Sequence, residues 1–352
     1  MSQPLISILI PTYNREDVVE HALISACSQT YPTIEIVVCD NASADRTFEI
    51  VQAYARKDPR IRCYRNSENI GPVGNWLRCL AESRGELIKI LFSDDWLEPE
   101  ALEQLAEPLI ADSTIGFVYA ATDIHGLNKI QKSTWGLGQD YKLPTFKYLT
   151  GFITGNIPVP FSPSIALFRR TDVVCYLTAE NENRLELDCA RYGMGNDSTL
   201  YLQACYDYPF FYHISQTLIH ICANADSITV KIGGSDRVLI RYCYMNAFAR
   251  ALAKSNVRNP ERCRLHSLLF LNLLFFSLQE RLQSRSSASR LLPVNEAYRC
   301  LFPIGYDPFR FTFLDSEIVA LVVREGWPTV IQWAKFLFNS LRRSISTKVG
   351  SG

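Results

Sequence analysis

The sequence has no excess of charge of either sign, and this excludes a broad class of partners. Its 352 residues include 36 Lys and Arg and 36 Asp and Glu, so the formal net charge is zero. Proteins that bind nucleic acid carry a basic excess, because phosphate contacts supply much of their affinity. We therefore expect no nucleic-acid partner.

The sequence also lacks metal-binding cysteine pairs, a signal peptide and a run long enough to span a membrane. The 11 cysteines form no Cys-x-x-Cys pair and are odd in number, and Cys39, Cys79 and Cys205 fall in apolar stretches, so we interpret the cysteines as reduced core residues. The chain starts Met1-Ser2-Gln3-Pro4 without a signal-peptide pattern. Its most hydrophobic run, 268–276, is shorter than the roughly 20 apolar residues of a membrane span. We expect a cytoplasmic protein.

What the sequence does contain is an alternation of apolar strands and amphipathic helices. Strands are predicted over 5–10, 34–39, 61–64 and 87–92, and helices over 15–29, 45–57 and 74–83. Apolar strands that alternate with helices indicate a parallel sheet covered on both faces. The predicted fold class is therefore α/β, with a Rossmann-like sheet.

Polar residues follow the predicted strands directly. They are Thr12 to Asn14, Asp40 with Asn41, and Asp94 with Asp95. Since the carboxyl ends of parallel strands share one edge, these clusters predict a nucleotide crevice. Two adjacent carboxylates repel each other unless a cation joins them, which suits Mg²⁺ or Mn²⁺ on a phosphate. On the pair alone, a helix N-terminus near Glu98 is an equal alternative.

Five short blocks lie in the first hundred residues: ILIPTYNR at 8–15, VCDNASAD at 38–45, NIG at 69–71, RGE at 84–86 and FSDD at 92–95. In order and spacing they resemble the family 2 glycosyltransferases, which have the GT-A fold. The resemblance implies that Asp40 accepts the N3–H of uracil, although a turn aspartate bonded to its own backbone is the alternative. It implies that Asp95 binds Mg²⁺ or Mn²⁺ on the diphosphate and that Asp94 faces the sugar or ribose. The other implied nucleotide-binding residues are Pro11, Thr12, Tyr13, Asn14, Asn69 and Gly71.

The resemblance returns further along the chain, at 195–205 and 225–229. By that match Asp197 is the general base, whereas its alternative is an acid at a helix start. Two residues depart from the family pattern: Asn196 stands where a Glu is usual, and Asn224 where many relatives have a histidine. The nearby His220, on an apolar strand, is interpreted as a hydrogen-bonded core residue.

We predict two regions. Residues 1–232 form the GT-A domain, with a nucleotide-binding half at 1–120 and an acceptor half at 121–232, and residues 233–352 form a helical extension with helices at 237–254, 260–283 and 317–346. The segment 121–163 has the Gly, Pro and aromatic composition of mobile binding loops. Trp135 within it either stacks on a sugar or anchors the loop.

The last predicted helix is basic and amphipathic. Trp333, Phe336, Leu337 and Leu341 recur at helical spacing, and no acid follows before Lys348. This favours a peripheral contact of 333–348 with an anionic membrane, although a solvated helix end is an alternative. The sequence is also compatible with a homo-oligomer.

Together these features predict an inverting, metal-dependent glycosyltransferase. It would move one sugar from a nucleotide-diphospho-sugar, with UDP-sugar favoured, to a hydroxyl of a lipid-linked glycan or polysaccharide precursor. The Gln-x-x-Arg-Trp motif and multiple spans of the processive synthases in this family are absent from the sequence. Two alternatives are a nucleotidyltransferase, which usually needs a Gly-rich loop after the first strand, and a non-catalytic carbohydrate-binding scaffold with a degenerate site.

Overall fold

The computed structural model describes residues 3–126, 129–155, 157–178, 193, 195–223, 237–254 and 265. The predicted helices at 260–283 and 317–346, the segment 333–348 and Asn224 lie outside them. In chain order the elements are β1 (Ile6–Thr12), α1 (Val19–Cys27), β2 (Ile34–Asp40), α2 (Thr47–Ala55), β3 (Ile61–Arg65), α3 (Gly71–Glu82), β4 (Leu87–Ile90), β5 (Trp96–Leu97), α4 (Ala101–Ala111), β6 (Ile115–Gly126), β7 (Lys129–Thr134), β8 (Tyr141–Pro144), α5 (Thr145–Thr154), η1 (Pro163–Ile165), β9 (Ala166–Arg169), α6 (Arg170–Tyr176), α7 (Asn196–Asp207), β10 (Phe210–Ala223) and α9 (Arg237–Lys254).

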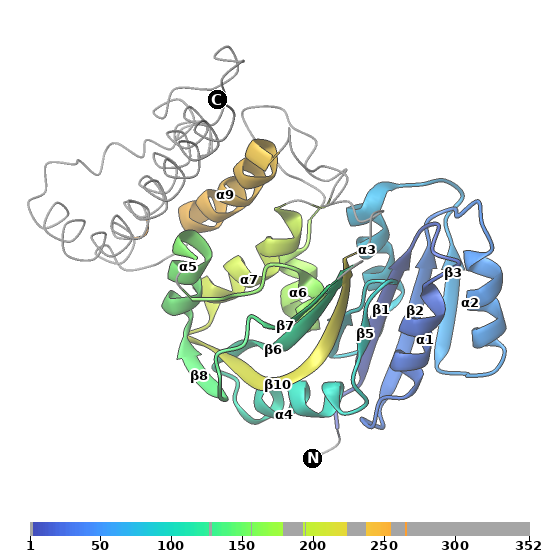
Figure 1. The fold of residues 1–352 in the computed structure, drawn as a ribbon, viewed down its shortest axis with the longest axis horizontal. Coiled ribbons are helices and arrows are strands. Elements are labelled where there is room, and N and C mark those ends of the chain that lie inside the picture. Colours follow the sequence, from blue (N-terminus) through green and yellow to red (C-terminus); the bar gives the residue numbers. More distant parts are fainter. Residues whose placement is uncertain are drawn as a thin grey trace, which may run out of the picture.

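The described strands form one mixed sheet (Figure 1). Its order is β3-β2-β1-β4-β9-β6-β10-β5, with β7 beside β6 and β8 beside β10. Strands β1 to β4 are mutually parallel, whereas β9 runs antiparallel to β4 and β6. Because β1 and β2 are buried at every position, helices must cover both faces. Right-handed crossovers put α1 and α2 on one face and α3 on the other. The predicted α/β sheet is confirmed.

Most predicted elements of the first half are present, with shifted ends. The first helix starts at Val19 and not at Arg15, where side chains at the start of α2 and in the loop before it accept the preceding amides. Thr47 Oγ1 accepts the Arg15 N–H at 2.7 Å, and Asp45 Oδ2 accepts the Glu16 N–H at 3.2 Å. The expectation of loops over 121–163 is wrong in part, since β7, β8 and α5 lie there. The helix predicted at 237–254 is α9, with the same bounds.

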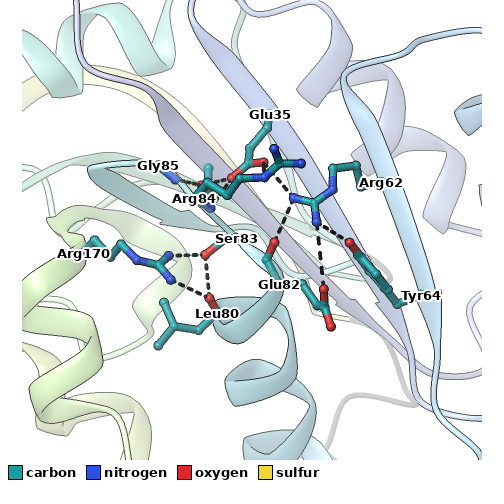
Figure 2. Close-up of polar contacts among 10 residues, drawn as sticks. Glu35, Arg62, Tyr64, Leu80, Glu82, Ser83, Arg84, Gly85 and Arg170 are labelled. Carbon is teal, nitrogen blue, oxygen red and sulfur yellow. Dashed lines mark hydrogen bonds and ion pairs between the residues drawn. The ribbon is translucent and has the colours of Figure 1, made fainter.

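A buried polar network closes the edge of the sheet where β1, β2 and β4 begin (Figure 2). Glu35 Oε1 accepts hydrogen bonds from Ser7 Oγ at 2.6 Å and from the Arg84 amide, while Arg62 Nη1 donates to Glu35 Oε2 at 3.1 Å. Burial alone would raise the pKa of Glu35, but these donors hold it below its usual value. The RGE block therefore serves the base of the sheet, opposite the edge predicted to bind a nucleotide.

Gly85 sits in this network where no side chain fits. Its amide donates to Ser7 Oγ at 2.7 Å, and a Cβ there would lie 2.5 Å from Ser7 Oγ and 2.8 Å from Leu5 O. We therefore expect Gly85→Ala to lower the free energy of unfolding by about 3 kcal/mol, the upper part of the usual overpacking range. Urea denaturation followed by circular dichroism measures this loss.

Gly74→Ala is the matched control for that prediction. Gly74 lies within α3, and the nearest atoms to a Cβ there belong to the flexible Ile70 side chain, at 3.3 Å and beyond. Since Ala is about 1 kcal/mol better than Gly in a helix interior, this variant should be neutral or more stable. Equal urea midpoints for Gly85→Ala and the unchanged protein would contradict the packing argument.

Helix α9 packs against α7, as Figure 1 shows. The contact is close because Gly195, just before α7, has a φ of +81° and a Cβ there would lie 2.7 Å from the Cys243 carbonyl oxygen. The start of the predicted helical extension thus packs on the predicted acceptor half, while the boundary at 232 stays a prediction. Within the described part of the chain, no helix has the length and apolar character to cross a bilayer.

Candidate active site

Three polar strand ends meet at one edge of the sheet. Thr12 pairs with Asp40 at the ends of β1 and β2, and β4, on the other side of β1, leads directly to Asp94 and Asp95. The alternative that this acidic pair starts a helix is wrong, because β5 intervenes and α4 begins only at Ala101 with no side-chain cap. The pair belongs to the strand edge.

The turn after β1 is held in place by the loop after β2. Asn14 has a φ of 50°, its amide donates to Ser43 Oγ at 2.9 Å, and its Oδ1 accepts the Ala44 N–H at 2.9 Å. Pro11 and Thr12 are buried, and Thr12 Oγ1 has no hydrogen-bond partner among the described residues. Tyr13, in contrast, is 43% exposed. The turn therefore presents an exposed ring beside a buried hydroxyl that can still bond a ligand.

Asp40 is fully buried and already engaged. Its Oδ2 accepts the Ser43 N–H at 3.0 Å, its Oδ1 accepts the Ser43 hydroxyl, and Arg65 Nε lies 3.4 Å from Oδ2. These are the contacts of the turn aspartate named as the alternative. A carboxylate has about four acceptor positions, so one more N–H donor can be bound. Its role towards a base remains a prediction.

An asparagine network joins the loop after β2 to the one before α3. Asn69 Oδ1 accepts from Asn41 Nδ2 at 2.8 Å and from the Gly71 N–H at 2.9 Å. Asn41 Oδ1 accepts the Ile70 N–H at 3.0 Å. Gly71 has a φ of +77°, which favours glycine. Asn69 and Gly71 therefore shape the rim of the edge, and a direct nucleotide contact stays a prediction.

The acidic pair sits in a setting that disfavours its negative charge. Burial raises the pKa of Asp95, and the neighbouring Asp94 raises it further. Burial also raises the pKa of Asp94, against the influence of Arg15, whose Nε lies 3.8 Å from Asp94 Oδ2. Two oxygen donors that gain from an added positive charge fit a hard divalent cation such as Mg²⁺ or Mn²⁺.

A buried lysine lies close enough to the pair to act on Asp95 through its charge. No role for it was predicted from the sequence. Lys89 of β4 has no exposed surface, and its Nζ donates to the Ser164 carbonyl oxygen. Ser164 also hydrogen-bonds the Asp95 carboxylate through its side chain. Burial lowers the pKa of Lys89 to about 7, whereas the charge of Asp95 acts to raise it. The sequence does mark this residue as unusual, since Lys89 is the one charged residue in the predicted apolar strand 87–92.

Asp197 lies in the first turn of α7, whose cap is Gly195, so it has the helix-start position named as its alternative, and its role as general base remains a prediction. Tyr244 of α9 donates its hydroxyl to Asp197 Oδ2 at 2.7 Å, and the Ser198 N–H donates to Oδ1 at 2.7 Å. Burial raises the pKa of Asp197 to about 7, although the Tyr244 hydrogen bond acts in the opposite direction. The side chain is therefore a carboxyl that can gain or lose a proton near neutral pH.

Tyr244→Phe tests that balance. The tyrosine hydroxyl stabilises the charged carboxylate, so its removal should move the pKa of Asp197 upward from about 7. Carbon-13 carboxyl shifts followed over a pH titration measure the value directly. Phe161→Leu, which alters another ring that packs on Tyr244 at 5.3 Å, should leave the pKa nearly unchanged. A lower pKa of Asp197 in Tyr244→Phe would contradict the conclusion that the Tyr244 hydroxyl stabilises the charged carboxylate.

Two contacts link α7 to the strand edge. Trp76 of α3 packs on Phe92 at 5.5 Å, and its ring blocks any side chain at Gly193, whose Cβ would lie 2.8 Å from it. Tyr201 of α7 donates to the Ser162 carbonyl oxygen at 2.6 Å, close to Ser164. The segments before Asp94 and before Asp197 thus share Trp76 as a neighbour.

The departures from the family pattern have different outcomes. Asn196 is buried and donates from Nδ2 to the Thr178 carbonyl oxygen at 2.7 Å, so a Glu there would place a charge in the interior. His220 is hydrogen-bonded, as predicted: its Nε2 lies 2.7 Å from Glu98 Oε1.

Two other predictions concern packing. Trp135 packs edge-on against Phe161 at 5.9 Å, which agrees with the alternative that it anchors the loop. Cys39, Cys79 and Cys205 are buried, as expected.

Comparison with known proteins identifies the family. Residues 7–177 match the model of glycosyl transferase family 2. An uncharacterized glycosyltransferase of Haemophilus influenzae is 31% identical over 143 residues, 40% of this chain and 57% of that protein, so the chain spans little more than half of that relative's length. The GalNAc(5)-diNAcBac-PP-undecaprenol beta-1,3-glucosyltransferase of Campylobacter jejuni is 26% identical over 230 residues, 64% of this chain and 68% of that protein.

A solved structure confirms the predicted GT-A fold. The crystal structure of S. aureus TarS 1–349 in complex with UDP-GlcNAc matches with a TM-score of 0.63 at 16% sequence identity, and the match covers 96% of this chain and 92% of that one. At this identity the likeness speaks for the fold alone, whereas the sequence matches speak for descent. The sequence matches therefore assign residues 7–177 of this chain to glycosyl transferase family 2.

Proposed function

We propose that the protein transfers one sugar from a nucleotide-diphospho-sugar to an acceptor hydroxyl, with inversion at the anomeric carbon. The observation that carries this is a carboxyl poised near neutral pH, Asp197, on a segment that shares a neighbour with the acidic pair: Trp76 packs on Phe92, just before Asp94, and lies against Gly193, just before α7. One carboxylate can take a proton, while the acidic pair would hold the cation that offsets the charge of the leaving diphosphate. These are the two tasks of a direct displacement.

In this proposal Asp197 removes the proton of the acceptor hydroxyl as the new C–O bond forms. The released nucleoside diphosphate takes the electron pair of the broken C–O bond. Tyr244 orients the carboxylate and favours its charged form, which lowers the pKa that burial raises. Thr12, Tyr13, Asn14 and Asp40 bind the nucleoside, with the spare acceptor position of Asp40 taking a base N–H.

Asp95 would hold the divalent cation, with Asp94 beside it facing the sugar or ribose. The cation, once bound, supplies positive charge against the leaving diphosphate. The Ser164 side chain bonds the Asp95 carboxylate, and the charge of Lys89, which donates to the Ser164 carbonyl oxygen, favours the ionised form of Asp95. Arg15 balances part of the charge of Asp94.

For the substrates, the relatives suggest a class. One is named as a glucosyltransferase on a diphosphoundecaprenol-linked glycan, and the TarS structure contains UDP-GlcNAc. We propose a UDP-sugar donor and a lipid-linked or polysaccharide acceptor, reached at the cytoplasmic side of a membrane through the segment 333–348. Transfer of single sugars, without processive synthesis, completes the proposal.

A donor panel tests the function. The full chain is incubated with Mn²⁺ and UDP-, GDP- and dTDP-sugars, and the products are identified by chromatography. A glycosyltransferase slowly releases the nucleoside diphosphate by donor hydrolysis, and we expect this with UDP-sugars. Release of pyrophosphate from a nucleoside triphosphate and a sugar phosphate would support the nucleotidyltransferase. Neither reaction, together with no donor-induced rise in the melting temperature, would support the scaffold.

A further inference from the structure

A second group of metal-ligating side chains lies on β6 and β10. Asp123, His125 and His220 each offer one ligand atom, and these atoms lie within 4.8 Å of one another. In the pairing of the two strands His220 lies opposite Asp123. His125 follows Asp123 by two residues, so both side chains leave the same face of the sheet. The register of the strands therefore assembles the group.

The two imidazoles are spaced like two ligands of one ion. His125 Nε2 lies 3.1 Å from His220 Nδ1. Two nitrogens bound to one tetrahedral Zn²⁺ at about 2.05 Å lie about 3.3 Å apart. An ion can therefore bind both nitrogens with little movement of either ring.

Glu98 determines which nitrogen of His220 is free to bind. Its Oε1 lies 2.7 Å from His220 Nε2, and because a carboxylate only accepts, the proton is on Nε2 and the lone pair is on Nδ1. That lone pair faces His125. A carboxylate behind a ligating histidine is the common supporting contact of metal sites, where it fixes the ring and its tautomer.

The rings are also stacked against a tryptophan. Trp96 of β5 stacks on His220 at 5.1 Å with an interplanar angle of 10°, and its ring centre lies 4.6 Å from that of His125. Trp96 and His220 are opposite one another in the β5–β10 pairing. A ligand set whose orientation is fixed before binding loses little entropy when the ion arrives.

We propose that Asp123, His125 and His220 bind a late first-row transition-metal ion, for which Zn²⁺ is the reference. Two imidazole nitrogens and one carboxylate suit Zn²⁺, Co²⁺, Ni²⁺ or Cu²⁺ and not Mg²⁺, which prefers oxygen. When the ion binds, the proton of His125 moves from Nε2 to Nδ1, so both rings stay neutral. The site is chemically distinct from the Asp94 and Asp95 pair and does not depend on the proposed transfer reaction.

Co²⁺ tests the proposal on the full chain in excess Mg²⁺. We expect visible absorption bands of nitrogen-ligated Co²⁺, displaced by Zn²⁺, and quenching of Trp96 fluorescence. His125→Gln and His220→Gln should each weaken Co²⁺ binding at least 100-fold. Glu98→Gln, which alters the supporting contact only, should weaken it about 10- to 100-fold. Trp96→Phe should retain the bands and lose most of the quenching.

The control is His21→Gln. His21 of α1 lies 6.2 Å from the Trp96 ring but outside the ligand group, so its loss should leave Co²⁺ affinity unchanged. Bands that survive in both histidine variants and vanish in Asp95→Asn would put the ion at the acidic pair and overturn the proposal. Absence of bands in the unchanged protein, with its fold verified by circular dichroism, would overturn it as well.

Discussion

Asp197→Asn is expected to reduce sugar transfer by about two to four orders of magnitude, the usual contribution of a positioned proton acceptor. The amide has nearly the shape of the protonated carboxyl, and a pKa of about 7 means that the native fold already accommodates that neutral form. Donor affinity should therefore persist. Initial rates with a UDP-sugar, together with donor affinity from calorimetry, measure both quantities.

Asp207→Asn, at the other end of α7, is the matched control. Asp207 is exposed and accepts a hydrogen bond from Tyr176, so its change should leave the transfer rate near that of the unchanged protein. Loss of donor affinity in Asp197→Asn would place Asp197 in the nucleotide or metal site, and the base would have to lie elsewhere. Since Asp197 is the proposed base, transfer in the unchanged enzyme should also fall below about pH 7, as Asp197 takes up a proton.

The sheet and its polar edge could be predicted because both are local patterns. Apolar runs of strand length define β1, β2 and β4, and the polar residue that follows each run marks the carboxyl end of the strand. Asp40 and Asp94 were located in this way. Even so, the contacts of Asp40 with Ser43 and Arg65 depend on the folded turn, and its ligand role remains a prediction.

The long-range partners of the site could not be predicted, since they depend on how distant segments pack. Tyr244 is 47 residues from Asp197 and lies in a helix that was assigned to a separate region. His125 and His220 are 95 residues apart and meet only through the register of β6 and β10. Periodicity locates such elements along the chain but does not say which faces meet. Lys89 is different, because its sequence position alone marked an unusual buried charge.

Asp95→Asn should abolish both transfer and Mn²⁺-dependent nucleotide binding. The amide keeps the size of the carboxyl but removes the negative charge that a hard cation needs. It can still accept the Cys222 N–H, which donates to Asp95 Oδ1 at 3.2 Å, so the local backbone should be preserved. The lost charge also removes the influence that raises the pKa of Lys89, so that lysine becomes neutral more readily and stays compatible with burial.

UDP binding with and without Mn²⁺, measured by calorimetry, checks this expectation. In the unchanged protein Mn²⁺ should strengthen UDP binding, and in Asp95→Asn it should have little effect. Asp112→Asn serves as the control, because Asp112 pairs with Lys142 at 2.6 Å on the surface and an exposed pair contributes little. If Mn²⁺ strengthens UDP binding equally in a folded Asp95→Asn variant, then Asp95 is not the ligand, and the raised pKa of Asp95 reflects burial and the neighbouring Asp94 without a metal-binding role.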